Sequence, residues 1–148
     1  MHVLPVDEYK KVKGPLSSVP INTLFVEAVI CGDVPGTVYV DDLKSPSVFY
    51  IVHSCSMSLL FGDTGNAAFN TRLAAYLMNT DKIRNTHEWM QAYPYAWTGR
   101  LEAMLGDNLT KKDEKDGDGD PGRVVEFSRV NFTFDPGQYR EAVDKRKN

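Results

Sequence analysis

The sequence predicts an α+β domain in which a small mixed or antiparallel sheet packs against several helices. Residues 37–40 and 48–52 are short runs of β-branched and aromatic side chains, as strands usually are. Residues 48–52 are almost continuously apolar, so this strand should be covered on both faces. Residues 66–78 predict a helix, because their apolar side chains recur at the spacing of one buried face: Phe69, Leu73, Tyr76 and Leu77.

The first third of the chain predicts an entry segment, a helix and two strands. Residues 1–14 are polar and interrupted by proline, so we expect a short helix or an extended entry segment. Apolar side chains recur at helical spacing over residues 21–31, and Gly32 ends that helix. After His53 the pattern alternates, so either one long strand continues or a tight turn near residues 54–56 makes a hairpin.

The second half predicts three further helices and a strand. Thr86 can cap a short helix that Pro94 ends. A longer helix follows, with buried positions at helical spacing: Trp97, Leu101, Met104 and Leu105. Residues 107–122 form a flexible acidic loop in this interpretation, and residues 123–134 form a strand with a bulge near residues 128–129. Residues 136–148 form a C-terminal helix or tail.

Length, composition and charge argue against several classes of function. A chain of 148 residues, 42% hydrophobic and 25% charged, fits a single folded domain over residues 1–148. A net charge of −3 gives no basic face for nucleic acid. No stretch approaches the ~20 apolar residues of a membrane helix. The first residues lack the apolar core of a signal peptide, so we expect no membrane association and a cytoplasmic location.

The acidic loop resembles a calcium site only in part. Asp116, Asp118 and Asp120 have the spacing of the first three ligands of an EF-hand. Pro121 and Phe127 stand where that loop needs glycine and a bidentate glutamate. The sequence therefore favours a solvated acidic turn and predicts no metal site.

An aromatic cluster around Pro94 is one candidate pocket. It consists of Trp89, Tyr93, Tyr95 and Trp97. Aromatic side chains supply much of the contact area of ligand sites, but the same cluster could be a core seam between two short helices. Both readings remain open, and the core reading is favoured.

His53 and Cys55 are added to this candidate pocket, because on one strand they would share a face and could form a thiol–imidazole contact. No Gly-rich or helix-start element beside them suggests an activated thiolate, so we expect Cys55, and likewise Cys31, to be small core residues. Asp42 and Asp63 are expected to cap turns, and Asp41 and Asp42 are not expected to share a ligand.

A series of short motifs resembles a known family. The residues that carry it are Gly36-Thr37-Val38-Tyr39-Val40-Asp41-Asp42, Pro46, Leu60-Phe61-Gly62-Asp63 with Asn66, Trp89, and Arg129-Val130-Asn131-Phe132-Thr133-Phe134. Their order over residues 15–135 resembles the amino-terminal half of acetyltransferases related to the zwittermicin A resistance enzyme, within the GNAT superfamily. The resemblance implies a GNAT-like (degenerate acyl-CoA N-acyltransferase-like) fold, in a family whose second half binds acetyl-CoA and performs the transfer.

The chain lacks the family's cofactor loop. That loop, of the form Arg/Gln-x-x-Gly-x-Gly/Ala, places the acetyl-CoA pyrophosphate on the amides of a helix start. No Arg or Gln in this chain is followed by that spacing, and Asp63 weakens the stretch 62–66 as an anion site. The resemblance therefore assigns no catalytic and no cofactor-binding residue here, and it implies acetyl-CoA only for a full-length relative.

Three functions follow as hypotheses. The preferred one is a non-catalytic N-terminal domain that helps form the substrate side of an acetyl-CoA-dependent transferase, with a catalytic half as its partner. The alternative is a stand-alone small-molecule-binding or protein-interaction module that self-associates, for example as a homodimer. The third is an active acyltransferase with an atypical cofactor loop.

Overall fold

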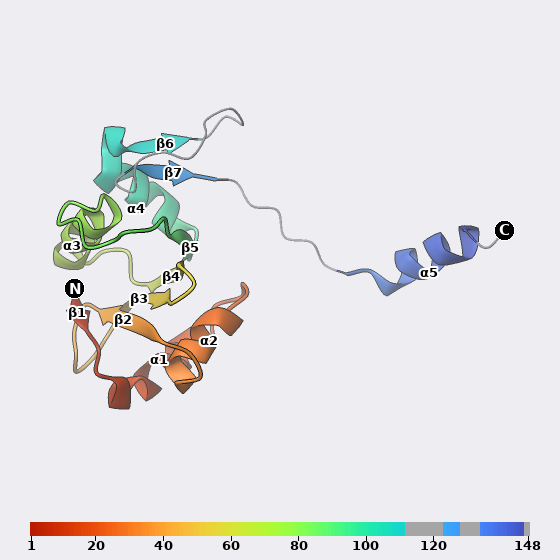
Figure 1. The fold of residues 1–148 in the computed structure, drawn as a ribbon, viewed down its shortest axis with the longest axis horizontal. Helices are drawn as coiled ribbons and strands as arrows, with labels where there is room; N and C mark the ends of the chain where they lie inside the picture. The colour runs from red at the N-terminus through yellow and green to blue at the C-terminus, as the bar shows by residue number, and fades with distance from the viewer. Residues whose placement is uncertain (112–122, 128–133, 147–148) are drawn as a thin grey trace.

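The computed structural model describes residues 1–111, 123–127 and 134–146. Its centre is a five-stranded sheet (Figure 1) with the order β1-β2-β3-β4-β5. The strands are β1 (His2–Val3), β2 (Gly36–Val40), β3 (Val48–His53), β4 (Met57–Gly62) and β5 (Trp89–Tyr93). The first four pair antiparallel, whereas β5 lies parallel to β4, so the sheet is mixed.

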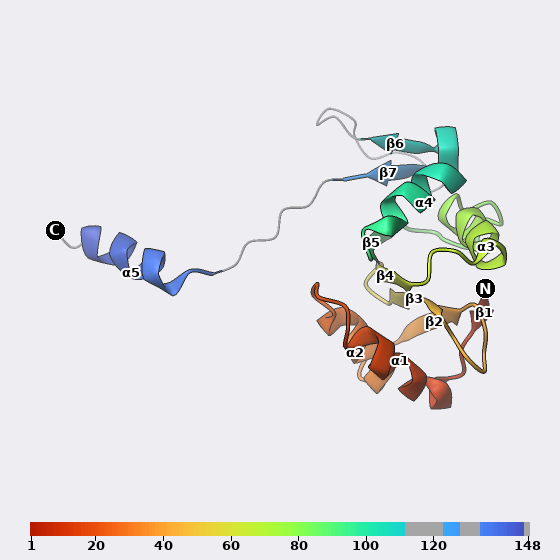
Figure 2. The same cartoon turned by 180° about the vertical axis from the view of Figure 1, so that it is seen from behind.

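Helices cover both faces of the sheet. Within the described residues there are five α-helices: α1 (Lys10–Leu16), α2 (Leu24–Cys31), α3 (Ala67–Leu77), α4 (Ala96–Leu105) and α5 (Pro136–Lys145). Figures 1 and 2 show α1 and α2 on one side of the sheet and α3 and α4 on the other, with α5 drawn apart from the rest. The predicted α+β class with a mixed sheet and packed helices is confirmed.

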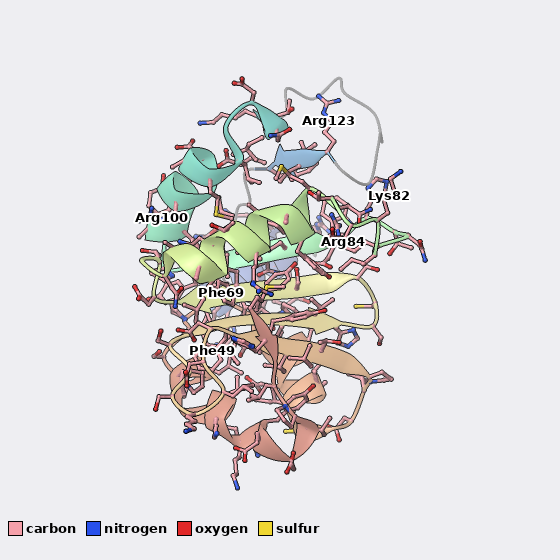
Figure 3. The ribbon with its side chains drawn as sticks, turned by 90° about the vertical axis from the view of Figure 1, so that its left-hand side faces the viewer. Phe49, Phe69, Lys82, Arg84, Arg100 and Arg123 are labelled. Carbon is pink, nitrogen blue, oxygen red and sulfur yellow. The ribbon has the colours of Figure 1, made fainter. Side chains whose placement is uncertain are left out.

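The sheet separates two hydrophobic cores because neighbouring side chains on a strand point to opposite faces. On β3, Phe49 and Ile51 belong to the core under α1 and α2. Val48 and Tyr50 belong to the core under α3 and α4. Figure 3 labels Phe49 on the first side and Phe69 of α3 on the second. The prediction that this strand is covered on both faces is confirmed.

Several other predicted elements are present. The helix predicted over residues 21–31 is α2, which ends at Gly32, a residue with a φ of 81°. The hairpin is the correct alternative after His53, since the backbone turns there and the Ser56 N–H donates to the His53 carbonyl at 3.0 Å. The helix around Trp97 is α4, and the entry segment holds β1, a 3₁₀ turn (Val6–Glu8) and the start of α1.

The short helix expected after Thr86 is wrong, because residues Trp89–Tyr93 form β5. The Trp89 N–H donates to the Ser56 carbonyl at 2.8 Å, and the strand then pairs with β4 along its whole length. Pairing with a strand about thirty residues away overrides a local capping signal.

The C-terminal third departs from the predicted loop and strand. Residues 109–111 form β6 (Leu109–Lys111), which pairs parallel with β7 (Val124–Glu126) after the 3₁₀ turn Gly106–Asn108. The rest of the acidic loop and the bulge near residues 128–129 lie outside the described residues. The final helix is α5, and the Asp135 carboxylate accepts the N–H groups of Gly137 and Gln138 at its start.

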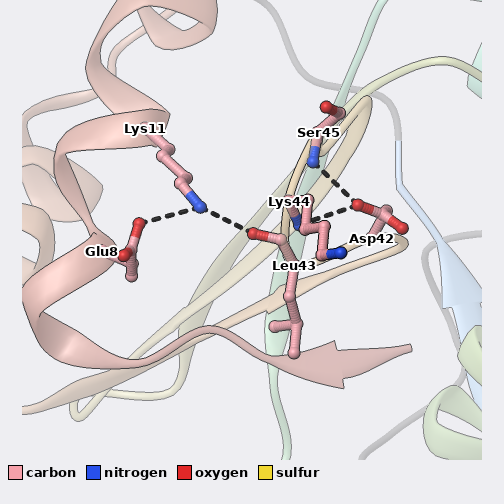
Figure 4. Close-up of polar contacts among 6 residues, drawn as sticks. All are labelled: Glu8, Lys11, Asp42, Leu43, Lys44 and Ser45. Carbon is pink, nitrogen blue, oxygen red and sulfur yellow. Dashed lines mark hydrogen bonds and ion pairs between the residues drawn. The ribbon is translucent and has the colours of Figure 1, made fainter.

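A polar network fixes the loop between β2 and β3 against α1 (Figure 4). The Lys11 ammonium donates to the Leu43 carbonyl at 2.8 Å and pairs with Glu8 at 2.8 Å. Within the loop, the Asp42 carboxylate accepts the N–H groups of Lys44 and Ser45, each at 2.7 Å. The loop is therefore held in one conformation beside the end of β4.

The end of β4 is expected to require glycine at position 62. Gly62 has a φ of 104°, and a Cβ added there would lie 2.2 Å from the Ser47 carbonyl oxygen. We predict that Gly62→Ala lowers the free energy of unfolding by at least about 1–3 kcal/mol, the cost of such a backbone conformation before the clash is counted.

The matched control is Gly99→Ala in α4, where an added Cβ meets nothing within 4 Å. Alanine favours a helix, so this variant should be stabilised by about 0.5–1 kcal/mol. Urea unfolding of both variants tests the prediction, and equal effects of the two substitutions would contradict it.

Candidate binding site at the carboxyl end of β4 and β5

The parallel strands β4 and β5 end beside a cavity of about 280 Å³. Ligands commonly bind outside the carboxyl ends of parallel strands, where the chain leaves the sheet in different directions. Four parts of the chain form the walls, namely the end of α1 with the following loop, the β2–β3 loop with β3, and the ends of β4 and β5. The lining residues are Pro15, Ser18, Val19, Pro46, Ser47, Phe49, Phe61, Gly62, Tyr93 and Pro94.

The walls are mainly apolar. The rings of Phe49 and Phe61 stack with their centroids 4.9 Å apart. The two serine hydroxyls already have acceptors, since Ser47 donates to Asp41 at 2.7 Å and Ser18 donates to the Pro15 carbonyl at 2.8 Å. None of the described lining residues is charged. This cavity suits an uncharged, apolar or aromatic group of a ligand, and its described lining includes no carboxylate, imidazole or amine.

The Asp41 carboxylate holds the β2–β3 wall of the cavity. It accepts the N–H groups of Ser47 and Val48 at 2.9 and 3.0 Å, and the Ser47 hydroxyl at 2.7 Å. The side-chain amide of Asn66, at the start of α3, donates to the same carboxylate at 3.2 Å. Burial raises the pKa of Asp41, but the hydrogen bonds from Ser47 and Val48 outweigh burial and bring it below its ordinary value. Asp41 therefore stays ionised at neutral pH and is a poor general base.

The start of α3 is occupied by side chains of the chain itself. The Asn66 side chain accepts the Phe69 N–H at 3.0 Å and caps the helix. The exposed Asp63 carboxylate accepts the Gly65 N–H at 2.9 Å. A phosphate bound here would need such amides and would meet the negative charge of Asp63. The expected turn caps of Asp42 and Asp63 are both present.

The aromatic residues of the candidate pocket lie on different surfaces. Trp97 is on α4 and is fully buried in the core beneath α3 and α4. Tyr93 packs against the opposite core and lines the cavity. Trp89 and Tyr95 are 62% and 86% exposed. Of this cluster, Tyr93 is the member that the cavity includes, with Pro94 beside it.

His53 is the last residue of β3, and Cys55 lies in the turn between β3 and β4. His53 Nδ1 accepts the backbone N–H of Cys55 at 2.9 Å, so its contact is with the backbone. The expectation that Cys55 and Cys31 are small core residues is wrong, because both are exposed. The hairpin turn places Cys55 outside the sheet, and Cys31 is the last residue of α2.

Glu88 is a residue that sequence reasoning missed. Its carboxylate accepts hydrogen bonds from the hydroxyls of Tyr50 on β3 and Tyr76 on α3, the latter at 2.9 Å. Burial raises the pKa of Glu88 to about 7. No local signal could have found this residue, because Tyr50 lies 38 positions earlier in the chain.

Two further features concern metal binding and membrane crossing. Within the described residues, no group of three or more His, Cys, Asp or Glu side chains gathers to hold a metal ion. The three aspartates with EF-hand spacing, Asp116, Asp118 and Asp120, lie outside that part of the chain. Among the helices that the structure describes, none combines the length and apolar character needed to cross a membrane.

The role of Asp41 gives a direct test. Asp41→Asn keeps the shape of the side chain but removes the negative charge to which four donors form hydrogen bonds. We predict a free energy of unfolding at pH 7 that is lower by about 1.5–3 kcal/mol, the usual contribution of a hydrogen bond to a charged group. Because the pKa of Asp41 is lowered by folding, this stabilisation is present above the ordinary value of 3.8 and is lost as the pH falls through the folded value.

Asp42→Asn is the matched control, since Asp42 caps a turn that is exposed to solvent. Its effect at pH 7 should be clearly smaller. Urea unfolding at pH 7 and pH 3 measures both differences. Equal losses for the two variants, or a loss for Asp41→Asn that does not shrink at pH 3, would show that Asp41 does not have this role.

Comparison with known proteins gives one similarity. No family model matches the chain. The uncharacterized N-acetyltransferase YdfB of Bacillus subtilis (strain 168) is 22% identical to it over 124 residues, which are 83% of this chain. The match spans 41% of the length of that relative. The chain is thus weakly similar to an N-acetyltransferase, and its α+β architecture with a mixed sheet is compatible with a GNAT-like fold.

Proposed function

We propose that this chain is a GNAT-like N-terminal domain, of the type in zwittermicin A resistance-type acetyltransferases, that is non-catalytic and helps form the substrate side of an acetyl-CoA-dependent transferase. The observation that carries the proposal is the junction between β4 and α3. There, Asn66 and Asp63 use the amides of Phe69 and Gly65 that a cofactor phosphate would need.

The cavity supports a role in binding substrate. Its apolar walls lie at the carboxyl end of β4 and β5, next to the start of α3, and its described lining includes no carboxylate, imidazole or amine that could accept a proton at neutral pH. Acyl transfer to an amine needs a group that accepts a proton near the reacting nitrogen. In this proposal a catalytic half supplies that group and acetyl-CoA, while this chain contributes an apolar wall.

The alternative is a stand-alone small-molecule-binding or protein-interaction module. A specific observation favours it, because Trp89 and Phe127 are exposed aromatic side chains with ring centroids 5.5 Å apart. Exposed apolar clusters are common at interaction surfaces. Sedimentation of the purified chain separates the two cases, since a stable homodimer without any acetyltransferase partner favours the module.

Calorimetric titration with acetyl-CoA tests the non-catalytic role. We expect no binding heat at millimolar cofactor from a sample whose folded state is verified by circular dichroism. The physical reason is that Asn66 and Asp63 already accept the Phe69 and Gly65 amides at this junction, and that Asp63 places an exposed carboxylate beside the start of α3. Micromolar binding would overturn this part of the proposal and favour an active acyltransferase with an atypical cofactor loop.

The cavity is tested with an apolar probe. We predict that indole shifts the amide resonances of Phe61, Gly62 and Tyr93, and that Ser18→Trp weakens this binding at least about tenfold because the larger side chain fills the cavity. Ser17→Trp is the matched control: Ser17 is also exposed and also bonds the carbonyl three residues before it, but it does not line the cavity. Equal affinities in the two variants would contradict the assignment.

A further inference from the structure

Glu88, the residue that precedes β5, connects three elements through one partly buried carboxyl group. Glu88 accepts hydrogen bonds from Tyr50 on β3 and Tyr76 on α3. Tyr50 is fully buried, and its hydroxyl also lies 3.1 Å from that of the buried Ser58 on β4. Ionisation of a carboxyl group at such a site costs free energy, unless hydrogen bonds and nearby charges compensate for the loss of water.

The neighbours of Glu88 are mainly tyrosines. Among the described residues, the titratable and charged groups of this cluster are Tyr39 on β2, Tyr50 on β3 and Tyr76 on α3, with Arg84 packed on the Tyr76 ring. Burial raises the pKa of Tyr76 to about 12, and burial together with the charge of Glu88 raises that of Tyr39. These hydroxyls therefore remain protonated donors across the physiological range.

Arg84 is engaged elsewhere in this cluster. Its guanidinium lies 5.4 Å from the centroid of the Tyr76 ring and donates to the Tyr76 and Leu77 carbonyls. Burial lowers the pKa of Arg84 but, at an ordinary value of 12.5, does not make it a titrating group near neutral pH. Glu88 is consequently the member of the cluster whose charge changes near neutrality.

In the part of the chain that the structure describes, the strand that follows Glu88 is held by strand pairing on one edge alone. Within the five-stranded sheet, β5 is an edge strand that pairs with β4 alone. Its first residue, Trp89, is bonded to the Ser56 carbonyl, and its last residue, Tyr93, lines the cavity. A change at the start of this five-residue strand can therefore reach the cavity wall through a continuous backbone.

We propose that the proton on the Glu88 carboxyl is a switch that decides how firmly β5 is docked, so that the cavity wall formed by Tyr93 responds to pH. With the proton bound, the carboxyl group carries no charge, and one of its oxygens becomes a donor to a tyrosine hydroxyl. When the proton leaves to solvent, a buried anion remains, and the two tyrosine donors offset only part of the cost of its burial.

The direction and size of the effect follow from linkage. A folded pKa of about 7 against an ordinary 4.5 means that folding favours the protonated form. The docked state is therefore most stable below pH 4.5 and loses this stabilisation as the pH rises through about 7. The equilibrium for opening β5 should increase by up to about 300-fold over that range.

Native-state hydrogen exchange, corrected for intrinsic rates, measures this opening. Between pH 5.5 and 8.5 we expect the protection of the Trp89 amide and the other β5 amides to fall at least about tenfold in the native chain. The Leu4 amide, which bonds Val38 between β1 and β2, serves as the internal reference. Glu88→Gln, which cannot ionise, should abolish the pH dependence at β5.

Glu102→Gln is the matched control, because Glu102 pairs with Lys111 at a partly exposed position away from β5. It should keep the native pH dependence. The proposal is overturned if protection at β5 in the native chain is independent of pH, or if Glu88→Gln retains the dependence.

A second measurement does not rely on the folding of Glu88→Gln. Carbon-13 NMR of the glutamate carboxyls follows the ionisation of Glu88 in the native chain and in Tyr76→Phe. Removing one donor to the anion should move the titration midpoint of Glu88 to higher pH. A midpoint near 4.5 in the native chain, or an unchanged midpoint in Tyr76→Phe, would contradict the switch.

Discussion

The carboxylate of Asp41 is the constraint on which the candidate site depends. It lies at the end of β2, binds the first amides of β3 and reaches the capping residue of α3. The same capping residue, Asn66, then fixes the first turn of α3. One ionised side chain thus positions the β2–β3 wall of the cavity and the helix start beside it. Because four donors share it, the geometry on both sides of the junction is set together.

This arrangement suits binding better than chemistry. The groups with charge near the cavity, Asp41 and Asp63, are used in bonds to the chain's own amides. The cavity itself presents stacked phenylalanine rings and serine hydroxyls that already have acceptors. The match covers 41% of an N-acetyltransferase, and the Phe69 and Gly65 amides near the start of α3 are already bonded, so both observations support our proposal that this chain forms one half of a larger unit. A catalytic partner would then act next to a preorganised apolar wall.

The sequence predicted what is encoded locally. The spacing of Phe69, Leu73 and Leu77 identified α3, and the apolar run of β3 identified a strand covered on both faces. It missed β5, because the signal at Thr86 is local while the pairing with β4 is not. The cavity could not be foreseen, since its walls come from four separate parts of the chain. Glu88 was missed for the same reason, because its partners lie on β3 and α3.

The measurement that tests the central role of Asp41 most directly is hydrogen exchange of the Asp41→Asn chain, residue by residue. If Asp41 joins the two sides of the site, protection should fall at Ser47 and Val48 and also at Phe69 in the first turn of α3, with Leu4 unchanged. A loss confined to Ser47 and Val48, with full protection at Phe69, would show that the loop and the helix start are held independently.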